Sequence, residues 1–131
     1  TSLREAVMST VDLTKENFES TVQKDGIVLI DFWADWCGPC KAFAPVYEKA
    51  AGEHDDVVFG KVNTEEQPEL AGTFRVSAIP TLMAFRDGIG VFSQPGMVPG
   101  SALDDLISKI RALDMDEVRQ KVAEHEASHQ H

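Results

Sequence analysis

Two cysteines, Cys37 and Cys40, stand between a predicted strand and a predicted helix, and the chain contains no other cysteine. Two thiols three positions apart at the start of a helix can close a small disulfide ring with little backbone movement. The unpaired N–H groups and the dipole at the helix N-terminus favour a thiolate at Cys37. We therefore predict a redox pair whose sulfur at position 37 is exposed, partly ionised and nucleophilic.

A Cys-x-x-Cys pair alone also occurs as an inert clasp or as part of a metal site. Two cysteines are too few for a closed zinc site and too close together for the disulfide framework of a secreted protein. The strand before the pair, the helix after it and the neighbouring Trp36 favour redox chemistry, so we expect no metal. The remaining candidate ligands are not expected to bind one either: they are His54, expected on the surface, and the tail residues His125, His129 and His131.

The hydrophobic pattern places the cysteines within an alternation of strands and helices. Ile27–Trp33 is an apolar run interrupted by Asp31, and it predicts a strand buried on both faces. A helix follows the cysteines to about Ala51, where Gly52 ends it, and Pro45 is expected to kink it. The remaining predicted strands are Val57–Asn63, Thr81–Arg86 and Ile89–Ser93, the last two joined as a hairpin by Asp87-Gly88. The remaining predicted helices are Thr14–Gln23, capped by Thr14, together with Gln67–Thr73 and Ser101–Leu113.

This order of elements predicts one α/β domain. Strands that alternate with helices form parallel pairs with helical crossovers, and the hairpin adds antiparallel strands. The result is a mixed central β-sheet with helices on both faces. We assign residues 1–10 to an N-terminal arm, 11–113 to the domain and 114–131 to a C-terminal tail. The tail is expected to hold a marginal helix, capped from Asp114, that ends in a disordered segment, 127–131.

The composition indicates a folded and acidic protein. Of the 131 residues, 43% are hydrophobic and 26% are charged, which is ordinary for a globular domain. The formal net charge of −10 argues against a nucleic-acid partner, because phosphates would repel it. No stretch approaches the roughly 20 apolar residues of a membrane span. Thr1–Met8 shows no signal-peptide pattern, and we expect a cytoplasmic monomer.

The strongest motif in the chain is a continuous segment, Ile30-Asp31-Phe32-Trp33-Ala34-Asp35-Trp36-Cys37-Gly38-Pro39-Cys40-Lys41. Three further features accompany it, namely Ala78-Ile79-Pro80-Thr81, Phe85-Arg86-Asp87-Gly88 and Gly96 in a late loop. Together they resemble the thioredoxin family. The similarity covers about Leu13–Leu113, in the family's order and spacing, and it implies the thioredoxin fold.

The resemblance implies a role for each residue near the cysteines. Cys37 attacks a substrate disulfide, and Cys40 then resolves the mixed disulfide. Asp31 is the candidate base, because a carboxylate inside a buried strand is costly to ionise and its pKa should rise towards neutrality. From the residue alone, an Asp without a role at a partly wet strand position is the alternative. Thioredoxins, however, carry a buried Asp here that reaches the resolving Cys through water, and Lys61 matches the family's Lys that pairs with it.

The resemblance also implies a surface that holds the substrate. Pro80 is expected to follow Ile79 through a cis peptide bond opposite the cysteines, where the Ile79 backbone is offered to an extended substrate. Pro95 stands where a Val or a similar residue is common in the family. An apolar patch is expected to complete the surface, formed by Trp36, Gly38, Pro39, Pro95 and Gly96.

We therefore expect a general protein-disulfide reductase, since the Gly-Pro pair between the cysteines matches the reducing members of the family. Electrons are expected from a flavin-containing thioredoxin reductase that uses NADPH, and this chain itself is expected to bind no cofactor. Its targets would be cytoplasmic proteins with disulfides. Two alternatives stay open: a dedicated or exported thiol–disulfide enzyme that serves one partner, and a non-catalytic scaffold that holds a partner on the surface between Cys37 and Pro80.

Overall fold

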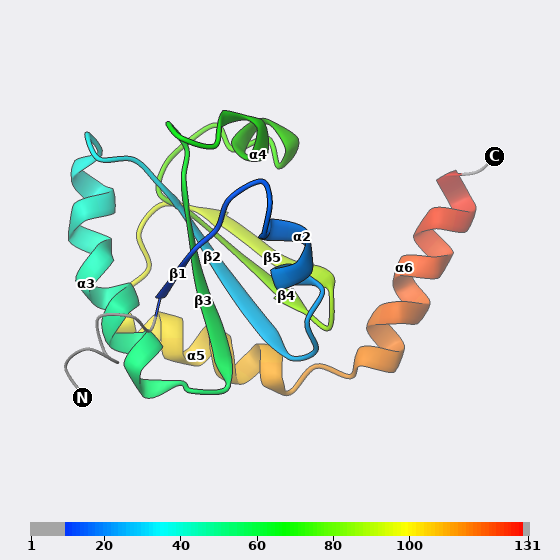
Figure 1. Ribbon diagram of the computed structural model, residues 1–131. Coiled ribbons are helices and arrows are strands. Elements are labelled where there is room, and N and C mark those ends of the chain that lie inside the picture. Colours follow the sequence, from blue (N-terminus) through cyan, green and yellow to red (C-terminus); the bar gives the residue numbers. More distant parts are fainter. Residues whose placement is uncertain (1–9, 130–131) are drawn as a thin grey trace.

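One mixed sheet forms the centre of the protein. A computed structural model describes residues 10–129, with side chains described as far as residue 126. Within these residues the strands are β1 (Thr10–Asp12), β2 (Ile27–Trp33), β3 (Val57–Asn63), β4 (Thr81–Arg86) and β5 (Ile89–Pro95). Their order across the sheet is β1-β3-β2-β4-β5, as Figure 1 shows. β3 lies parallel to β1 and β2, whereas β4 is antiparallel to β2 and β5, which confirms the predicted mixed sheet.

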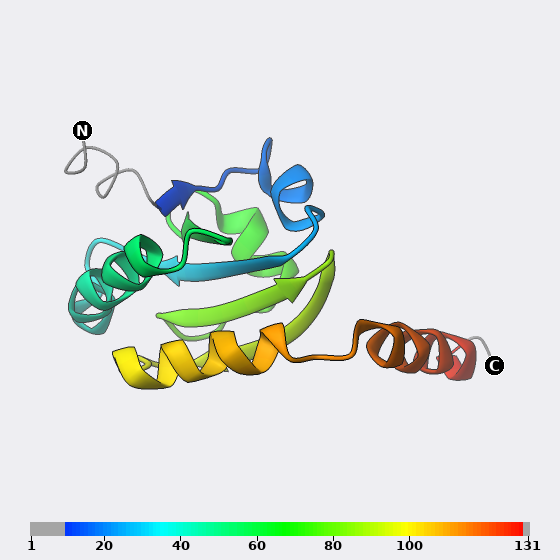
Figure 2. The same cartoon turned by 90° about the horizontal axis from the view of Figure 1, so that it is seen from below.

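Helices cover both faces of this sheet (Figures 1 and 2). They are α2 (Phe18–Val22), α3 (Gly38–Glu53), α4 (Pro68–Thr73), α5 (Gly100–Arg111) and α6 (Met115–His129). α3 and α5 pack on one face, and α2 and α4 on the other. α6 extends away from the body of the domain. Within residues 10–129, no helix combines the length and the apolar composition needed to cross a membrane.

β2 is buried on both faces, as its apolar run predicts. Ile27 and Leu29 pack towards α3 and α5, while Val28, Ile30 and Phe32 pack towards the opposite layer. Burying an apolar side chain of this size contributes about 1.5–3 kcal/mol. Because apolar residues fix β2 from both sides, the backbone that follows Trp33 leaves the sheet at a defined position. That position is where the cysteines lie.

β1 is the strand that the sequence prediction misses, since Thr10 was expected in a loose arm. Its three residues pair in parallel with β3, with Thr10 opposite Phe59. Three residues are too few to show an alternating pattern, so the strand depends on its pairing at the sheet edge rather than on a local signal. Residues 1–9 of the predicted arm lie outside the described residues.

Several element boundaries differ from the predicted ones, among them both ends of α5, which spans Gly100–Arg111 and not Ser101–Leu113. α2 begins at Phe18 and not at Thr14, because the Asn17 side chain accepts a hydrogen bond from the Thr14 N–H at 2.7 Å and forms a turn there. α3 continues through Gly52 to Glu53, and β5 continues past Ser93 to Pro95. The β5 extension is paired with β4, with Pro95 opposite Thr81.

The predicted cap of the C-terminal helix is confirmed. The Asp114 carboxylate accepts hydrogen bonds from the N–H groups of Asp116 (3.1 Å) and Glu117 (3.2 Å). The helix is longer than predicted, because α6 reaches His129 and so enters the segment expected to be disordered. Its apolar stripe is thin, since Met115 is buried while Val122 is exposed. The domain boundary at residue 113 stays a prediction.

Candidate active site

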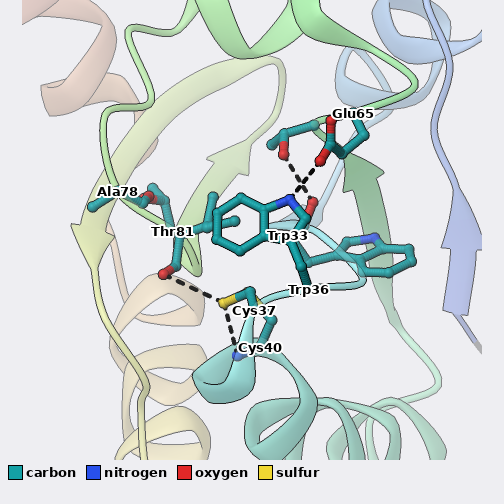
Figure 3. Close-up of a disulfide and its surroundings, with 9 residues drawn as sticks. Trp33, Trp36, Cys37, Cys40, Glu65, Ala78 and Thr81 are labelled. Carbon is teal, nitrogen blue, oxygen red and sulfur yellow. Dashed lines mark hydrogen bonds between the residues drawn. A yellow bond between two sulfur atoms is a disulfide. The ribbon is translucent and has the colours of Figure 1, made fainter.

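The cysteines lie at the junction between β2 and α3. Cys37 is the N-cap of α3, and its Sγ accepts a hydrogen bond from the Cys40 N–H at 3.2 Å (Figure 3). The two residues form a disulfide, and their Cα atoms are 5.2 Å apart. Pro39 fits in the first helical turn, where its missing N–H leaves no hydrogen bond unmade. The sulfur of Cys37 therefore occupies the place where a helix N-terminus favours negative charge.

Both cysteines are almost completely buried in this disulfide form. The exposed fraction is 4% for Cys37 and 3% for Cys40, so the prediction of an exposed Cys37 sulfur is wrong here. Trp36 beside them is 69% exposed, and its indole N–H donates a hydrogen bond to the Glu65 carboxylate. The Ile79 segment packs against the Cys37 sulfur. A partner must therefore approach along that surface.

The Ile79 segment lies against the disulfide. The Cys37 Sγ is 3.6 Å from the Ile79 carbonyl oxygen. The Ile79–Pro80 peptide bond is cis, which confirms that expectation. The Gly96 N–H donates to the Pro80 carbonyl at 2.8 Å, and the Thr81 hydroxyl donates to the Ala78 carbonyl. The first bond joins the loop at Gly96 to the Ile79–Pro80 segment, and the second lies within that segment.

The residues predicted to bind the target differ in how far they are exposed. Ile79 is half-buried and Pro80 is buried. Met97, which comes directly after Gly96, is 44% exposed and was not among the residues predicted for this surface. The exposed members of the predicted patch are Trp36, Gly38, Pro39, Pro95 and Gly96.

Asp31 is completely buried, on the face of β2 that carries α3. Neither carboxylate oxygen has a hydrogen-bond partner within residues 10–126. Burial raises the pKa of Asp31 to about 7, and the nearby positive charge of Lys61 opposes this rise. The predicted shift towards neutrality is confirmed. Burial of Tyr47 likewise raises the pKa of its hydroxyl well above the usual value, and the negative charge of Asp31 adds to this rise.

Lys61 is held beside Asp31 by an aromatic ring rather than by an ion pair. The two residues are opposite each other in the β2–β3 register. The Lys61 ammonium lies 4.9 Å from the centre of the Trp33 ring, a cation–π distance. Within residues 10–126, Lys61 makes no ion pair with Asp31 closer than 4 Å. Sequence reasoning did not assign Trp33 to the site. The sequence nevertheless indicates that Trp33 lies near Asp31, because residues 31 and 33 project from the same face of a strand.

A small cavity connects these groups to the disulfide. Its volume is about 90 Å³, and its lining includes Asp31, Trp33, Cys40 and Lys61. The Trp33 indole nitrogen is buried and, like the Asp31 oxygens, has no partner within the described residues. The buried carboxylate and the second cysteine therefore face one cavity.

His54 lies away from this site, on the side of α3 that faces α5. His54 is partly exposed at the surface, and its ring nitrogen lies 2.9 Å from the Asp104 carboxylate of α5, a partner that the sequence did not predict. Its ring also stacks on Phe59. Within the described residues, no three His, Cys, Asp or Glu side chains are arranged to hold a metal ion.

Comparison with known proteins identifies the family. The family model described as Thioredoxin matches residues 9–125. The chain is a member of the thioredoxin family. It is 63% identical over 119 residues to "Putative thioredoxin 2" of Streptomyces coelicolor, which covers 91% of this chain and 89% of that protein. It is 42% identical over 105 residues to a thioredoxin of Staphylococcus haemolyticus, across 78% of this chain and 98% of that one.

A solved structure agrees with this assignment. A mutant thioredoxin from Halobacterium salinarum matches with a TM-score of 0.74 at 33% identity, over 79% of this chain and 92% of that chain. The chain is thus a protein-disulfide oxidoreductase of the thioredoxin family, and Cys37 and Cys40 are its redox pair. Thioredoxins in general reduce disulfide targets and are themselves reduced by thioredoxin reductase.

Proposed function

We propose that Cys37 is the attacking sulfur of a general reductase of protein disulfides. Its thiolate attacks one sulfur of a target disulfide, forms a mixed disulfide and releases the other target sulfur as a thiolate. Cys40 then attacks the Cys37 sulfur, releases the second target sulfur and closes the Cys37–Cys40 disulfide. One electron pair passes to the target. The observation that carries this order is the position of Cys37 as the N-cap of α3, where negative charge is favoured.

We propose that Asp31 accepts the proton of Cys40 in the second step. The thiol must lose a proton before it attacks, and a carboxyl whose pKa is about 7 can accept one near neutral pH. Both groups line the cavity of about 90 Å³, which is large enough for water to carry the proton between them. Lys61 assists by stabilising the carboxylate form, as its opposing effect on the Asp31 pKa indicates.

The target is proposed to bind beside Cys37 as an extended segment. The Ile79 carbonyl, 3.6 Å from the Cys37 sulfur, is placed to accept a hydrogen bond from the main chain of the target. The exposed Trp36, Pro39, Pro95 and Gly96 supply the apolar surface around it. Main-chain recognition of this kind depends little on the sequence of the target, which suits a general reductase.

The oxidised pair is proposed to be reduced by thioredoxin reductase, a flavoenzyme that uses NADPH, in the cytoplasm. The net charge of −10 would steer both the reductase and the targets through their basic surfaces. The chain needs no cofactor of its own for this cycle, because every electron pair moves between sulfur atoms.

Reduction of insulin disulfides with dithiothreitol as the electron source tests this proposal. The wild-type protein should accelerate the reduction, and Cys37→Ser should abolish the acceleration because the attacking sulfur is gone. Cys40→Ser is the matched variant: it keeps the attacking sulfur and should accumulate a mixed disulfide with insulin, visible by mass spectrometry. Acceleration by Cys37→Ser, or a mixed disulfide formed only through Cys40, would contradict the assignment of the nucleophile.

A further inference from the structure

Lys61 has two candidate partners on one face of the sheet. It lies directly opposite Asp31 in the register between β2 and β3. Trp33 is two residues further along β2, so its side chain projects from the same face as that of Asp31. The flexible four-carbon stem of a lysine lets its ammonium reach either neighbour. In the structure the ammonium lies 4.9 Å from the centre of the Trp33 ring, and within residues 10–126 it forms no ion pair with Asp31 closer than 4 Å.

The ring competes with the carboxylate for this ammonium. Asp31 is completely buried, and its two carboxylate oxygens have no hydrogen-bond partner within the described residues. When it is ionised, such a carboxylate attracts a nearby cation strongly, because the protein interior screens charge poorly. Lys61 and Asp31 also border the same cavity of about 90 Å³, so one space connects the two groups. An aromatic face attracts a partly desolvated ammonium as well, and this attraction opposes that of the carboxylate.

The other titratable groups around Asp31 do not take the place of Lys61. Asp35 and Lys41 also line the cavity, but both are exposed, and solvent screens their charges. Tyr47 of α3 is buried, and its raised pKa keeps the hydroxyl neutral. β4 places an apolar residue opposite Asp31. Lys61 therefore supplies the positive charge that acts on Asp31, as its lowering effect on the Asp31 pKa shows.

We propose that Trp33 is a positioning residue whose ring holds the Lys61 ammonium and prevents it from forming a direct ion pair with Asp31. An opposite charge in direct contact lowers the pKa of a carboxyl group by about 1–3 units. Such an ion pair would make Asp31 a weaker base for the Cys40 thiol at neutral pH, where a base with a pKa near the working pH is most effective. The inference rests on the proposed function, because the position of Lys61 affects catalysis only if Asp31 accepts that proton.

Titration of Asp31 in the oxidised protein tests the position of Lys61. The ¹³C chemical shift of the Asp31 carboxyl group reports its ionisation directly, and the disulfide-bonded cysteines do not titrate. The midpoint in wild type should be at about pH 7. Trp33→Leu removes the ring and should lower this midpoint by about one unit or more, because Lys61 can then reach the carboxylate. Trp33→Phe keeps an aromatic face and should keep the midpoint close to that of wild type.

Trp33→Leu combined with Lys61→Met is the matched control. Without the ammonium, loss of the ring should leave the Asp31 midpoint at or above the wild-type value. An unchanged midpoint in the single variant Trp33→Leu overturns the inference. A lowered midpoint that persists in the double variant also overturns it, because entry of water and not the lysine would then explain the change.

A second measurement uses the wild-type protein and so does not depend on the stability of Trp33→Leu. The ring current of Trp33 should shift the ε-methylene protons of Lys61 upfield of those of the exposed Lys41. Equal chemical shifts for the two lysines would overturn the inference.

Insulin reduction at pH 7 tests the proposed role of Asp31 separately. The reaction should be several-fold slower with Trp33→Leu than with Trp33→Phe. If the Asp31 midpoint falls in Trp33→Leu and the rate does not, the placement of Lys61 is supported, and the proposal that Asp31 accepts the Cys40 proton is overturned.

Discussion

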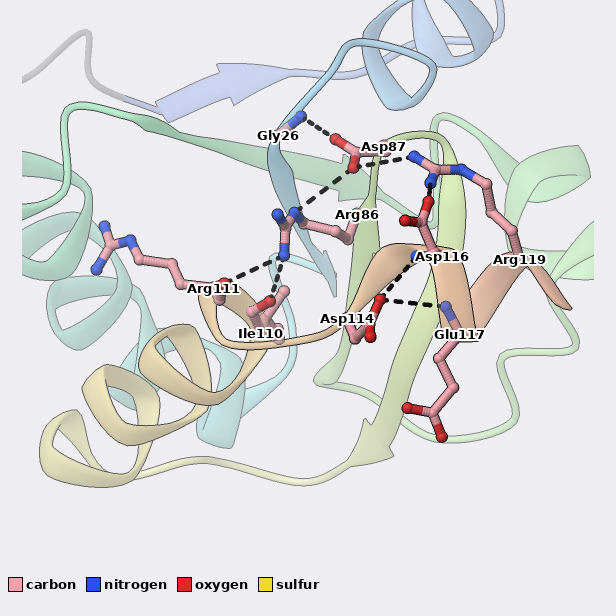
Figure 4. Close-up of polar contacts among 9 residues, drawn as sticks. All are labelled: Gly26, Arg86, Asp87, Ile110, Arg111, Asp114, Asp116, Glu117 and Arg119. Atoms are coloured by element: carbon pink, nitrogen blue, oxygen red, sulfur yellow. Dashed lines mark hydrogen bonds and ion pairs between the residues drawn. The ribbon is translucent and has the colours of Figure 1, made fainter. Parts of the chain in front are cut away.

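Two carboxylates near opposite ends of β2 are treated by the fold in opposite ways. Asp31, towards the cysteines, is fully buried and has no hydrogen-bond partner within the described residues. Asp87, in the turn between β4 and β5, accepts the Gly26 N–H at 2.7 Å. It also lies 3.8 Å from the Arg86 guanidinium and 3.7 Å from that of Arg119 in α6 (Figure 4). One acid is isolated and the other is surrounded by donors.

This difference separates a chemical role from a structural one. An isolated buried carboxylate is costly to ionise, so Asp31 holds a proton up to about neutral pH and can exchange it with Cys40. A carboxylate with several donors instead fixes the groups around it, and Asp87 joins the start of β2, the hairpin and α6. Arg86 extends this network by donating to the Ile110 carbonyl at 2.7 Å, at the end of α5.

The largest expected effect concerns the isolated acid. Native Asp31 keeps its proton to about pH 7, whereas an unfolded Asp loses it near 3.9. The native state therefore binds more protons between these values, and the free energy of unfolding must fall as the pH rises through them. The fall is about 4 kcal/mol, since each pH unit corresponds to about 1.36 kcal/mol. Asp31→Asn should remove this fall, so its stability relative to wild type should increase by about 4 kcal/mol from pH 4 to pH 8.

Urea unfolding of the oxidised proteins at several pH values measures this difference. The oxidised form is chosen because disulfide-bonded cysteines do not titrate, and the other acids cancel between the two proteins. A constant cost of the buried amide shifts the whole curve without changing its slope. A difference between wild type and Asp31→Asn that does not vary with pH would show that Asp31 ionises normally, and the comparison with Asp87 would fail.

Replacing Asp87, the partnered acid, should lower the free energy of unfolding, by less than the change expected for Asp31→Asn. Asp87→Ala removes the acceptor for the Gly26 N–H and leaves a residue without a local hydrogen bond at a φ of 52°. The left-handed region costs about 1–2 kcal/mol for such a residue, and a lost buried hydrogen bond adds about 1 kcal/mol. We expect a destabilisation of about 2 kcal/mol in urea unfolding at pH 7. Asp87→Asn keeps the acceptor and tolerates this φ, so it should lose less than half as much; an equal loss would assign the effect to charge alone.

The sequence predicts the isolated acid better than the partnered one. Asp31 stands inside a continuous apolar run, and burial alone raises its pKa, so local pattern and general chemistry suffice. The place of Lys61 depends on the register between β2 and β3 and on the Trp33 ring, neither of which is local in sequence. Asp87 was predicted only as a turn residue, because its partner Arg119 belongs to a tail helix whose docking no periodicity reveals.

His54 and β1 follow the same rule. His54 looks like a polar residue near a helix end, yet Asp104, fifty positions later, and Phe59 hold its ring. β1 has three residues and exists through pairing with β3. Cys37 and Cys40, in contrast, lie three positions apart in one motif, and Pro80 was recognised through its own motif. Features fixed by neighbours in the chain were predictable, and those fixed by distant partners were not.

The smallest expected effect is at the outer end of the partnered network. Arg119 is half-exposed and joins α6 to Asp87 at 3.7 Å and to Asp116 at 3.1 Å. Exposed ion pairs contribute about 0–1 kcal/mol and are screened by salt, so Arg119→Ala should leave the global Tm within about 4 °C of wild type. Amide hydrogen exchange in α6 should nevertheless accelerate several-fold, and 0.5 M salt should produce the same change in wild type. Amide exchange in β2 around Asp31 should stay unchanged, because burial and not ion pairing sets the surroundings of Asp31. If exchange in α6 and in β2 changed together, the two acids would not act independently.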